Sequence, residues 1–302
     1  MCLLIFLRLF IYNDLMKINK KIIWRFFIIL LILIIALEAL TRLLGIADVP
    51  LRDSNSVTGY IPKSSQSGRF LTNDWNINAM QMISTKEFSS DNNEILLAGD
   101  SIIYGGNSLK QKDRVGEQLD SIMLDINVFT IADASWGFKN SLNYLEANQE
   151  KLFGIERIIF ILNSGDFGEP SSWRCGSFHP ISKPVSHLIF AVRKYLIPQC
   201  LAKPKKDTLV KDYNATRKLN ILVSKFKNTD FIIFLYQNRN EYKNKHNLIK
   251  LLDKDIHTRV GVYQLIDYSP IWKNKYYSDG IHLTSEGTAA LAKILKRVTN
   301  DN

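Results

Sequence analysis

Residues 94–107 read EILLAGDSIIYGGN, and this stretch decides how the rest of the chain is interpreted. The apolar run 95–98 stops at Gly99, which is typical of a buried strand that leads into a turn. In open parallel sheets, ligands bind outside the carboxyl ends of the strands, so the turn places Asp100 and Ser101 where chemistry usually occurs. By itself, a Gly-Asp-Ser turn is explained equally well as a helix cap. A reactive serine also needs a base, which another part of the chain must supply.

The base lies near the other end of the chain, where residues 276–287 read YYSDGIHLTSEG. Asp279 and His282 are three residues apart, so the carboxylate can bond one ring nitrogen while the other nitrogen faces a nucleophile. We therefore predict a catalytic triad in which Ser101 attacks, His282 is the base and Asp279 orients it. The chain order excludes a chymotrypsin-like arrangement, and Ile103 stands where an α/β-hydrolase elbow requires glycine.

Together, the Gly-Asp-Ser turn and the Asp-x-x-His motif resemble the SGNH/GDSL hydrolase superfamily, over about residues 93–298. The resemblance implies an α/β three-layer sandwich with a five-stranded parallel sheet of the flavodoxin-like kind, and no cofactor. The hydrophobic pattern independently alternates between strand and helix about five times, which indicates a parallel sheet covered on both faces.

The resemblance also implies donors for the oxyanion, namely the backbone N–H groups of Ser101 and Gly137 and an asparagine side chain. A glycine at position 137 is also explained by the needs of a turn alone. The family's Gly-x-Asn-Asp block is replaced here by NSGD at residues 163–166, so Asn163 lies two positions early, about 7 Å along an extended strand. Losing one such donor costs about 3 kcal/mol of transition-state stabilisation, so the placement of Asn163 matters.

The N-terminus carries a separate apolar segment. Residues 22–46 are long enough to span a bilayer, and we predict an uncleaved transmembrane signal anchor there. Lys17, Lys20 and Lys21, at the end of segment 1–21, predict that this segment is cytoplasmic and that the catalytic domain lies outside the cytoplasm, as in a single-pass membrane protein. A cleaved signal peptide is the alternative, although no Ala-x-Ala site closes the apolar run. Met16 opens a more ordinary basic leader than Met1 and is an alternative start.

The remainder divides into three parts. Residues 47–90 are polar, with prolines and glycines, and are predicted to be a linker and edge segment without chemistry, in which residues 70–82 pair along the sheet edge. Residues 91–302 form the hydrolase-like domain. An insertion at about 168–206 interrupts the strand-helix alternation, and we expect it to cover the strand ends and shape the pocket.

The insertion contains two of the three cysteines, Cys175 and Cys200. Outside the cytoplasm, two thiols in one insertion favour a disulfide. No metal site is predicted, because His179 and His187 lack the spacing of metal ligands and no Cys-x-x-Cys motif is present.

The net charge of the chain indicates which classes of partner to expect. The formal net charge is +10 over 302 residues, but lysines and arginines are scattered and no nucleic-acid-binding motif occurs, so no nucleic acid is expected as a partner. We interpret the charge as juxtamembrane and surface charge that would suit anionic envelope polymers.

The predicted function is a serine acyl-ester hydrolase, specifically a carbohydrate O-acetylesterase that acts on cell-envelope or secreted glycans. The substrate class is what membrane-anchored relatives imply. Two alternatives stay open: an O-acetyltransferase that works with a multi-pass membrane-bound O-acyltransferase as acyl donor, and an inactive glycan-binding protein. The expected partners are therefore an acylated glycan or other small ester, the lipid bilayer and, for the transferase, that membrane protein.

Overall fold

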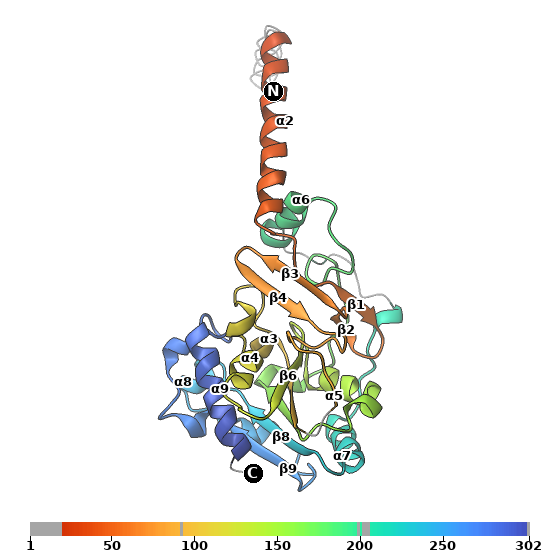
Figure 1. Ribbon diagram of the computed structural model, residues 1–302, viewed down its shortest axis with the longest axis vertical. Coiled ribbons are helices and arrows are strands. Elements are labelled where there is room, and N and C mark those ends of the chain that lie inside the picture. The colour runs from red at the N-terminus through yellow and green to blue at the C-terminus, as the bar shows by residue number, and fades with distance from the viewer. Residues whose placement is uncertain (1–19, 91–92, 198–199, 201–205, 301–302) are drawn as a thin grey trace, which may run out of the picture.

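The computed structural model describes residues 20–90, 93–197, 200 and 206–300 (Figure 1). The predicted cytoplasmic segment lies almost wholly outside these residues, as do both candidate start methionines. The orientation of the N-terminus therefore stays a prediction.

A parallel sheet of five strands forms the centre of the domain, in the order β6-β5-β7-β8-β9 (Figure 1). The strands are β5 (Glu94–Gly99), β6 (Asn127–Ala132), β7 (Arg157–Leu162), β8 (Asp230–Leu235) and β9 (Val260–Gln264). Counted along the chain within this sheet, the spatial order is 2-1-3-4-5, which is the flavodoxin-like arrangement. The predicted fold class is confirmed.

Helices cover both faces of the sheet. The four longer ones are α4 (Val115–Asp120), α5 (Phe138–Ala147), α7 (Ala215–Lys225) and α9 (Ser285–Asn300), and the short ones are α3 (Ser101–Tyr104) and α8 (Arg239–Lys243). A further short helix, α6 (His187–Ala191), belongs to the insertion and lies at the base of the N-terminal helix. Ile95 and Leu97 of β5 belong to the core beneath α4 and α9, whereas Leu96 and Ala98 belong to the core beneath α5 and α7. Successive side chains of a strand point to opposite faces, so the unbroken apolar run of β5 follows from burial on both faces.

The N-terminal helix α2 (Lys20–Leu43) has 24 residues, none of them buried, and extends away from the domain (Figure 1). Its length and composition are sufficient to cross a membrane, and a signal sequence would meet the same criteria. The helix ends at Leu43, and backbone hydrogen bonds continue through a turn to Ile46.

The C-terminal end of α2 contacts the insertion directly. The Glu38 carboxylate accepts hydrogen bonds from His187 N–H at 3.1 Å, Leu188 N–H at 2.9 Å and Ser186 Oγ at 2.8 Å. Because the first N–H groups of a helix lack intrahelical acceptors, Glu38 caps α6. Arg42 Nη2 also donates to Val185 O at 2.5 Å. The insertion is therefore fastened to the apolar helix, and Figure 1 shows α6 at the base of α2.

The polar segment 47–90 is folded. It forms two antiparallel pairs, β1 (Arg52–Asn55) with β2 (Gly59–Pro62) and β3 (Gln66–Phe70) with β4 (Asn73–Ile77). The expected pairing of residues 70–82 along the central sheet is not found, because β3 and β4 pair with each other. Just beyond them, Ile83 N–H donates to Thr130 O of β6 at 2.7 Å. The segment boundaries at 46/47 and 90/91 stay a prediction.

Candidate active site

Ser101 lies where β5 ends and α3 begins. The Asp100 side chain accepts a hydrogen bond from Ile102 N–H at 2.9 Å and caps this single helical turn, which Gly105 closes at a φ of 75°. Asp100 is thus a helix cap, and the cap presents Ser101. The position lies beside the boundary between β5 and β7, the switch point at which this strand order binds ligands.

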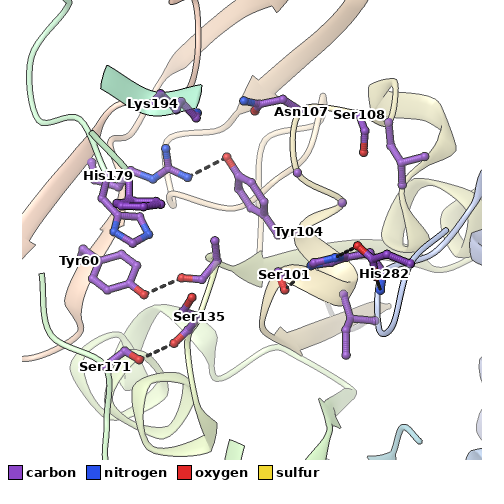
Figure 2. A pocket seen from close by; sticks show the side chains of 18 of the residues that line it. Tyr60, Ser101, Tyr104, Asn107, Ser108, Ser135, Ser171, His179, Lys194 and His282 are labelled. Carbon is purple, nitrogen blue, oxygen red and sulfur yellow. Dashed lines mark hydrogen bonds and ion pairs between the residues drawn. The ribbon is translucent and has the colours of Figure 1, made fainter. Parts of the chain in front are cut away.

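The structure brings the three predicted catalytic residues together. His282 Nε2 lies 3.0 Å from Ser101 Oγ, and His282 Nδ1 lies 2.7 Å from Asp279 Oδ2 (Figure 2). Both distances are hydrogen bonds, so the imidazole connects the carboxylate to the hydroxyl. The pair is accessible, with side-chain exposures of 46% for His282 and 56% for Asp279.

Hydrogen bonds keep Asp279 ionised. Partial burial raises its pKa, but hydrogen bonds from Ile281 N–H, the His282 ring and His282 N–H outweigh burial and bring the pKa to about 2. Asp279 Oδ1 accepts both of those backbone N–H groups at 2.8 Å. The carboxylate is therefore negative wherever the histidine can act as a base.

The loop that carries this pair is held at both ends. Tyr277 and Leu283 form an antiparallel bridge, and Ser278 N–H donates to His282 O at 2.8 Å. The buried Tyr277 hydroxyl donates to Gln237 O at 2.6 Å. Helix α9 starts at Ser285, so the His282 imidazole lies between the turn closed by the Tyr277–Leu283 bridge and the first turn of a helix that packs on the core.

The two further oxyanion donors expected from the resemblance are already engaged. Gly137 N–H donates to Asn140 Oδ1 at 3.0 Å within the cap of α5. Asn163 Nδ2 donates to Asp100 Oδ2 at 3.0 Å and to Asp166 Oδ2 at 2.9 Å, which uses both amide hydrogens. This corrects the expectation for Asn163: its amide lies between two buried carboxyl groups and has no hydrogen left for an ester oxygen.

Asn163 therefore joins the serine turn to the next strand end. Burial, together with the neighbouring Asp100, raises the pKa of Asp166 to about 9. Burial also raises the pKa of Asp100 to about 6, against the hydrogen bond from Ile102 N–H and the field of His282. Asp100 and Asp166 can both lie buried next to the Asn163 amide when one of the two carboxyl groups is protonated, because two negative charges then do not face each other.

A cavity of about 810 Å³ adjoins Ser101 and His282. Its walls come from the serine turn, the loop after β6, the insertion and the loop before α9, and also from Arg52 and Tyr60 of the segment 47–90. Sequence analysis missed these two residues, because nothing local distinguishes an arginine or a tyrosine in a polar stretch.

Arg52 and Tyr60 organise one wall of the cavity. Arg52 forms a buried ion pair with Asp133, with Nη2 2.9 Å from Oδ1 and Nε 3.0 Å from Oδ2, and it donates to Tyr104 Oη at 3.0 Å. The Tyr60 ring stacks on His179 at a centroid distance of 4.0 Å (Figure 2). The polar segment is thereby part of the site.

Cys175 and Cys200 form a disulfide, with their Cα atoms 5.8 Å apart, which is the pairing expected from the sequence. Cys200 lines the cavity, so the bridge braces the insertion where it meets the site. Within residues 20–90, 93–197, 200 and 206–300, no group of three or more His, Cys, Asp or Glu is placed to hold a metal ion.

No protein-family model matches the sequence, and no curated protein matches it at a significant level. Similar solved structures include a member of the lipolytic G-D-S-L family from Veillonella parvula, 10% identical, covering 68% of this chain and 97% of that one at a TM-score of 0.38. A putative lipolytic G-D-S-L protein from Desulfitobacterium hafniense is 13% identical and covers 68% and 99% at 0.37. The acetylxylan esterase Axe2 from Geobacillus stearothermophilus is 13% identical and covers 68% and 94% at 0.34. At such low scores these likenesses carry no weight for the activity of this chain.

Proposed function

We propose that the protein is a serine ester hydrolase that acts through a covalent acyl intermediate. Ser101 Oγ attacks the ester carbonyl carbon, and His282 Nε2 takes its proton and passes it to the leaving alcohol. Water, activated by the same nitrogen, then attacks the acyl-enzyme and releases the acid and free Ser101. The observation that carries this proposal is the continuous contact from Asp279 through His282 to Ser101, at 2.7 and 3.0 Å.

The proposed oxyanion donors are the backbone N–H groups of Ser101 and Ser135. Ser101 is the first residue of α3, so its N–H has no intrahelical acceptor. Ser135 lines the cavity in the left-handed region, at a φ of 64°. Its N–H has no acceptor within the described part of the chain, whereas those of Ala134, Trp136 and Gly137 are hydrogen-bonded. Strained non-glycine backbone often accompanies function, which favours Ser135 over Asn163.

We further propose that the substrate is an acylated carbohydrate, as expected for a glycan O-acetylesterase. The cavity volume lies in the range of small-molecule sites, and several lining residues besides Ser101 carry a hydroxyl group that can bond a sugar. These hydroxyl residues are Ser108, Ser135, Ser171, Ser172, Ser278 and Tyr60.

We place the catalytic domain outside the cytoplasm, anchored to the bilayer by α2. The disulfide supports this location, because such bonds persist in oxidising compartments. The apolar helix with no buried residue supports the anchor.

The test is hydrolysis of a nitrophenyl acetate and of an acetylated oligosaccharide by the full-length chain in detergent, beside a Ser101→Ala variant. We expect turnover to fall by at least about 1,000-fold, because the covalent route is lost. Ser121→Ala is the matched control, since it removes a hydroxyl group from an exposed serine that does not line the cavity. Unchanged turnover by a folded Ser101→Ala variant would exclude the mechanism.

The exposure of the triad favours a second candidate, transfer of the acyl group to a sugar hydroxyl. With His282 and Asp279 about half exposed, an acceptor alcohol can reach the acyl-enzyme as readily as water. The transfer reaction would use the same Ser101, His282 and Asp279, and a multi-pass membrane protein would supply the acyl group. Acetylated oligosaccharide formed from a labelled acetyl ester and a free sugar acceptor would identify transfer, and acetate alone would identify hydrolysis.

A further inference from the structure

The wall of the cavity that the insertion contributes is positively charged. Arg174 and Lys194 both line the cavity, and both come from the segment predicted to shape the pocket. Figure 2 shows Lys194 and His179 at one end of the cavity, with Ser101 and His282 at the other. A substrate whose ester lies at Ser101 can therefore extend toward the cationic end.

Among the described residues, no carboxylate neutralises the charge of this wall. Asp279 is the one carboxylate among the described residues that line the cavity, and it pairs with His282. Arg52 also lines the cavity, but Asp133 balances its charge through two hydrogen bonds. In the described part of the chain, neither the exposed Arg174 nor the half-buried Lys194 forms an ion pair, so no carboxylate there balances either cation.

The surroundings of Lys194 make an unbalanced cation unfavourable. Burial and, to a smaller extent, the nearby Arg52 together lower the pKa of Lys194 to about 8. The Phe190 and Tyr195 rings lie 5.3 and 5.8 Å from the ammonium nitrogen, which positions the group without neutralising it. The neighbouring His179 is kept neutral, since burial lowers its pKa to about 4, so it adds no charge near neutral pH.

One polar atom of this wall also lacks a partner. His179 Nδ1 is buried and has no hydrogen-bond partner in the described structure. Because the protein encloses this nitrogen, the wall offers a ligand its two cations and not the His179 ring nitrogen.

We propose that Arg174 and Lys194 form a subsite for an anionic group of the substrate, so that the preferred ester is an acylated acidic glycan. The anionic group is a carboxylate, sulfate or phosphate, all of which accept charge-assisted hydrogen bonds from guanidinium and ammonium groups. The subsite explains why the insertion carries cations toward the cavity. As a statement about substrate class it rests on the proposed function, although binding alone can test it.

The first experiment measures binding to the full-length Ser101→Ala protein in nanodiscs by calorimetry, which requires no turnover. The ligands are trisaccharides of equal length that are neutral, uronate-containing or sulfated, and the last two distinguish the sources of the anion. Lys194→Met and Arg174→Gln are each expected to weaken binding of an acidic ligand by about 10-fold and to leave the neutral ligand unchanged. Arg193→Met is the matched control, because Arg193 precedes Lys194 in the same turn, is exposed and does not line the cavity.

The acidic ligand should also bind more weakly as the pH rises through about 8, where Lys194 loses its proton, and as salt is added. Lys194→Met should abolish this step in the pH profile, whereas Arg193→Met should keep it. Equal binding of neutral and acidic ligands, or an equal effect of the Arg193 and Lys194 substitutions, would overturn the subsite. Acid-selective binding by a protein without esterase activity would uphold the subsite and reject the proposed function, so the two failures are distinguishable.

Discussion

Replacing Arg52 with methionine should destabilise the protein strongly. Arg52 and Asp133 have side-chain exposures of 5% and 0%, and two hydrogen bonds of 2.9 and 3.0 Å join them. Methionine keeps much of the volume but removes the charge, which leaves Asp133 with the Ala134 N–H as its remaining donor. Breaking a buried pair in this way costs about 3–5 kcal/mol, because one charge stays in the interior without a partner.

That loss is a large part of the roughly 5–15 kcal/mol that stabilises a typical domain. With a denaturant dependence of about 3 kcal/mol per molar urea, the unfolding midpoint should fall by about 1–2 M. Urea titration of the full-length chain in detergent, followed by tryptophan fluorescence, measures the shift. Arg69→Met is the control, because Arg69 pairs with Asp74 at the surface, with exposures of 67% and 65%, and such pairs contribute about 1 kcal/mol or less.

A double-mutant cycle isolates the interaction between the two side chains. Arg52→Met combined with Asp133→Asn removes both charges, so its loss of stability should be about 2 kcal/mol smaller than the sum of the single losses. If Arg52→Met costs no more than Arg69→Met, the polar segment 47–90 is not held to the domain by this ion pair, and our reasoning about it is wrong.

Three further predictions concern the site and the insertion. Asp279→Asn should lower kcat about 100- to 10,000-fold with little change in KM, because the imidazole loses the partner that fixes its tautomer, and steady-state kinetics would show this; an unchanged kcat would mean that His282 needs no orienter. Ser135→Gly should raise the free energy of unfolding by up to about 1 kcal/mol, because glycine adopts the left-handed backbone conformation without strain. The substitution keeps the backbone N–H that we propose as an oxyanion donor. Urea titration measures the change, and a loss of stability would argue against strain at this position. Glu38→Ala should speed hydrogen exchange of the His187 and Leu188 amides while amides of the central sheet keep their protection, and equal rates before and after would show that Glu38 does not cap α6.

The parts of the fold and site that the sequence predicted depend on short-range signals. The strand β5 and the turn after it are contiguous, and Asp279 and His282 are three residues apart, so local spacing was enough to identify them. The pairing of His282 with Ser101, across 181 positions, was expected from the resemblance that the two motifs carry together and not from local spacing.

The parts that sequence analysis missed depend on contacts between distant residues. Arg52 meets Asp133 across 81 positions, and Asn163 meets Asp100 across 63. The polar composition of residues 47–90 led us to predict a linker that includes Arg52. Composition does not reveal that Asp133, far away in the sequence, neutralises this arginine. The two-residue spacing along the strand predicted the face on which Asn163 lies. It could not predict that the Asp100 and Asp166 carboxyl groups accept both hydrogens of its amide.

In a membrane-anchored protein, the contact between Glu38 and the first turn of α6 would fix the height of the cavity above the membrane. Under the proposed topology, the cavity is held at a set distance from the bilayer by direct contact between two helices and not by a chain of variable length. Every copy of the protein would then reach the same thin layer of the envelope, and esters deeper in the polymer would be out of range. A truncated chain that begins at Ala47 would lack this acceptor, so the turn that leads to Lys194 would be held by fewer contacts than in the full-length protein.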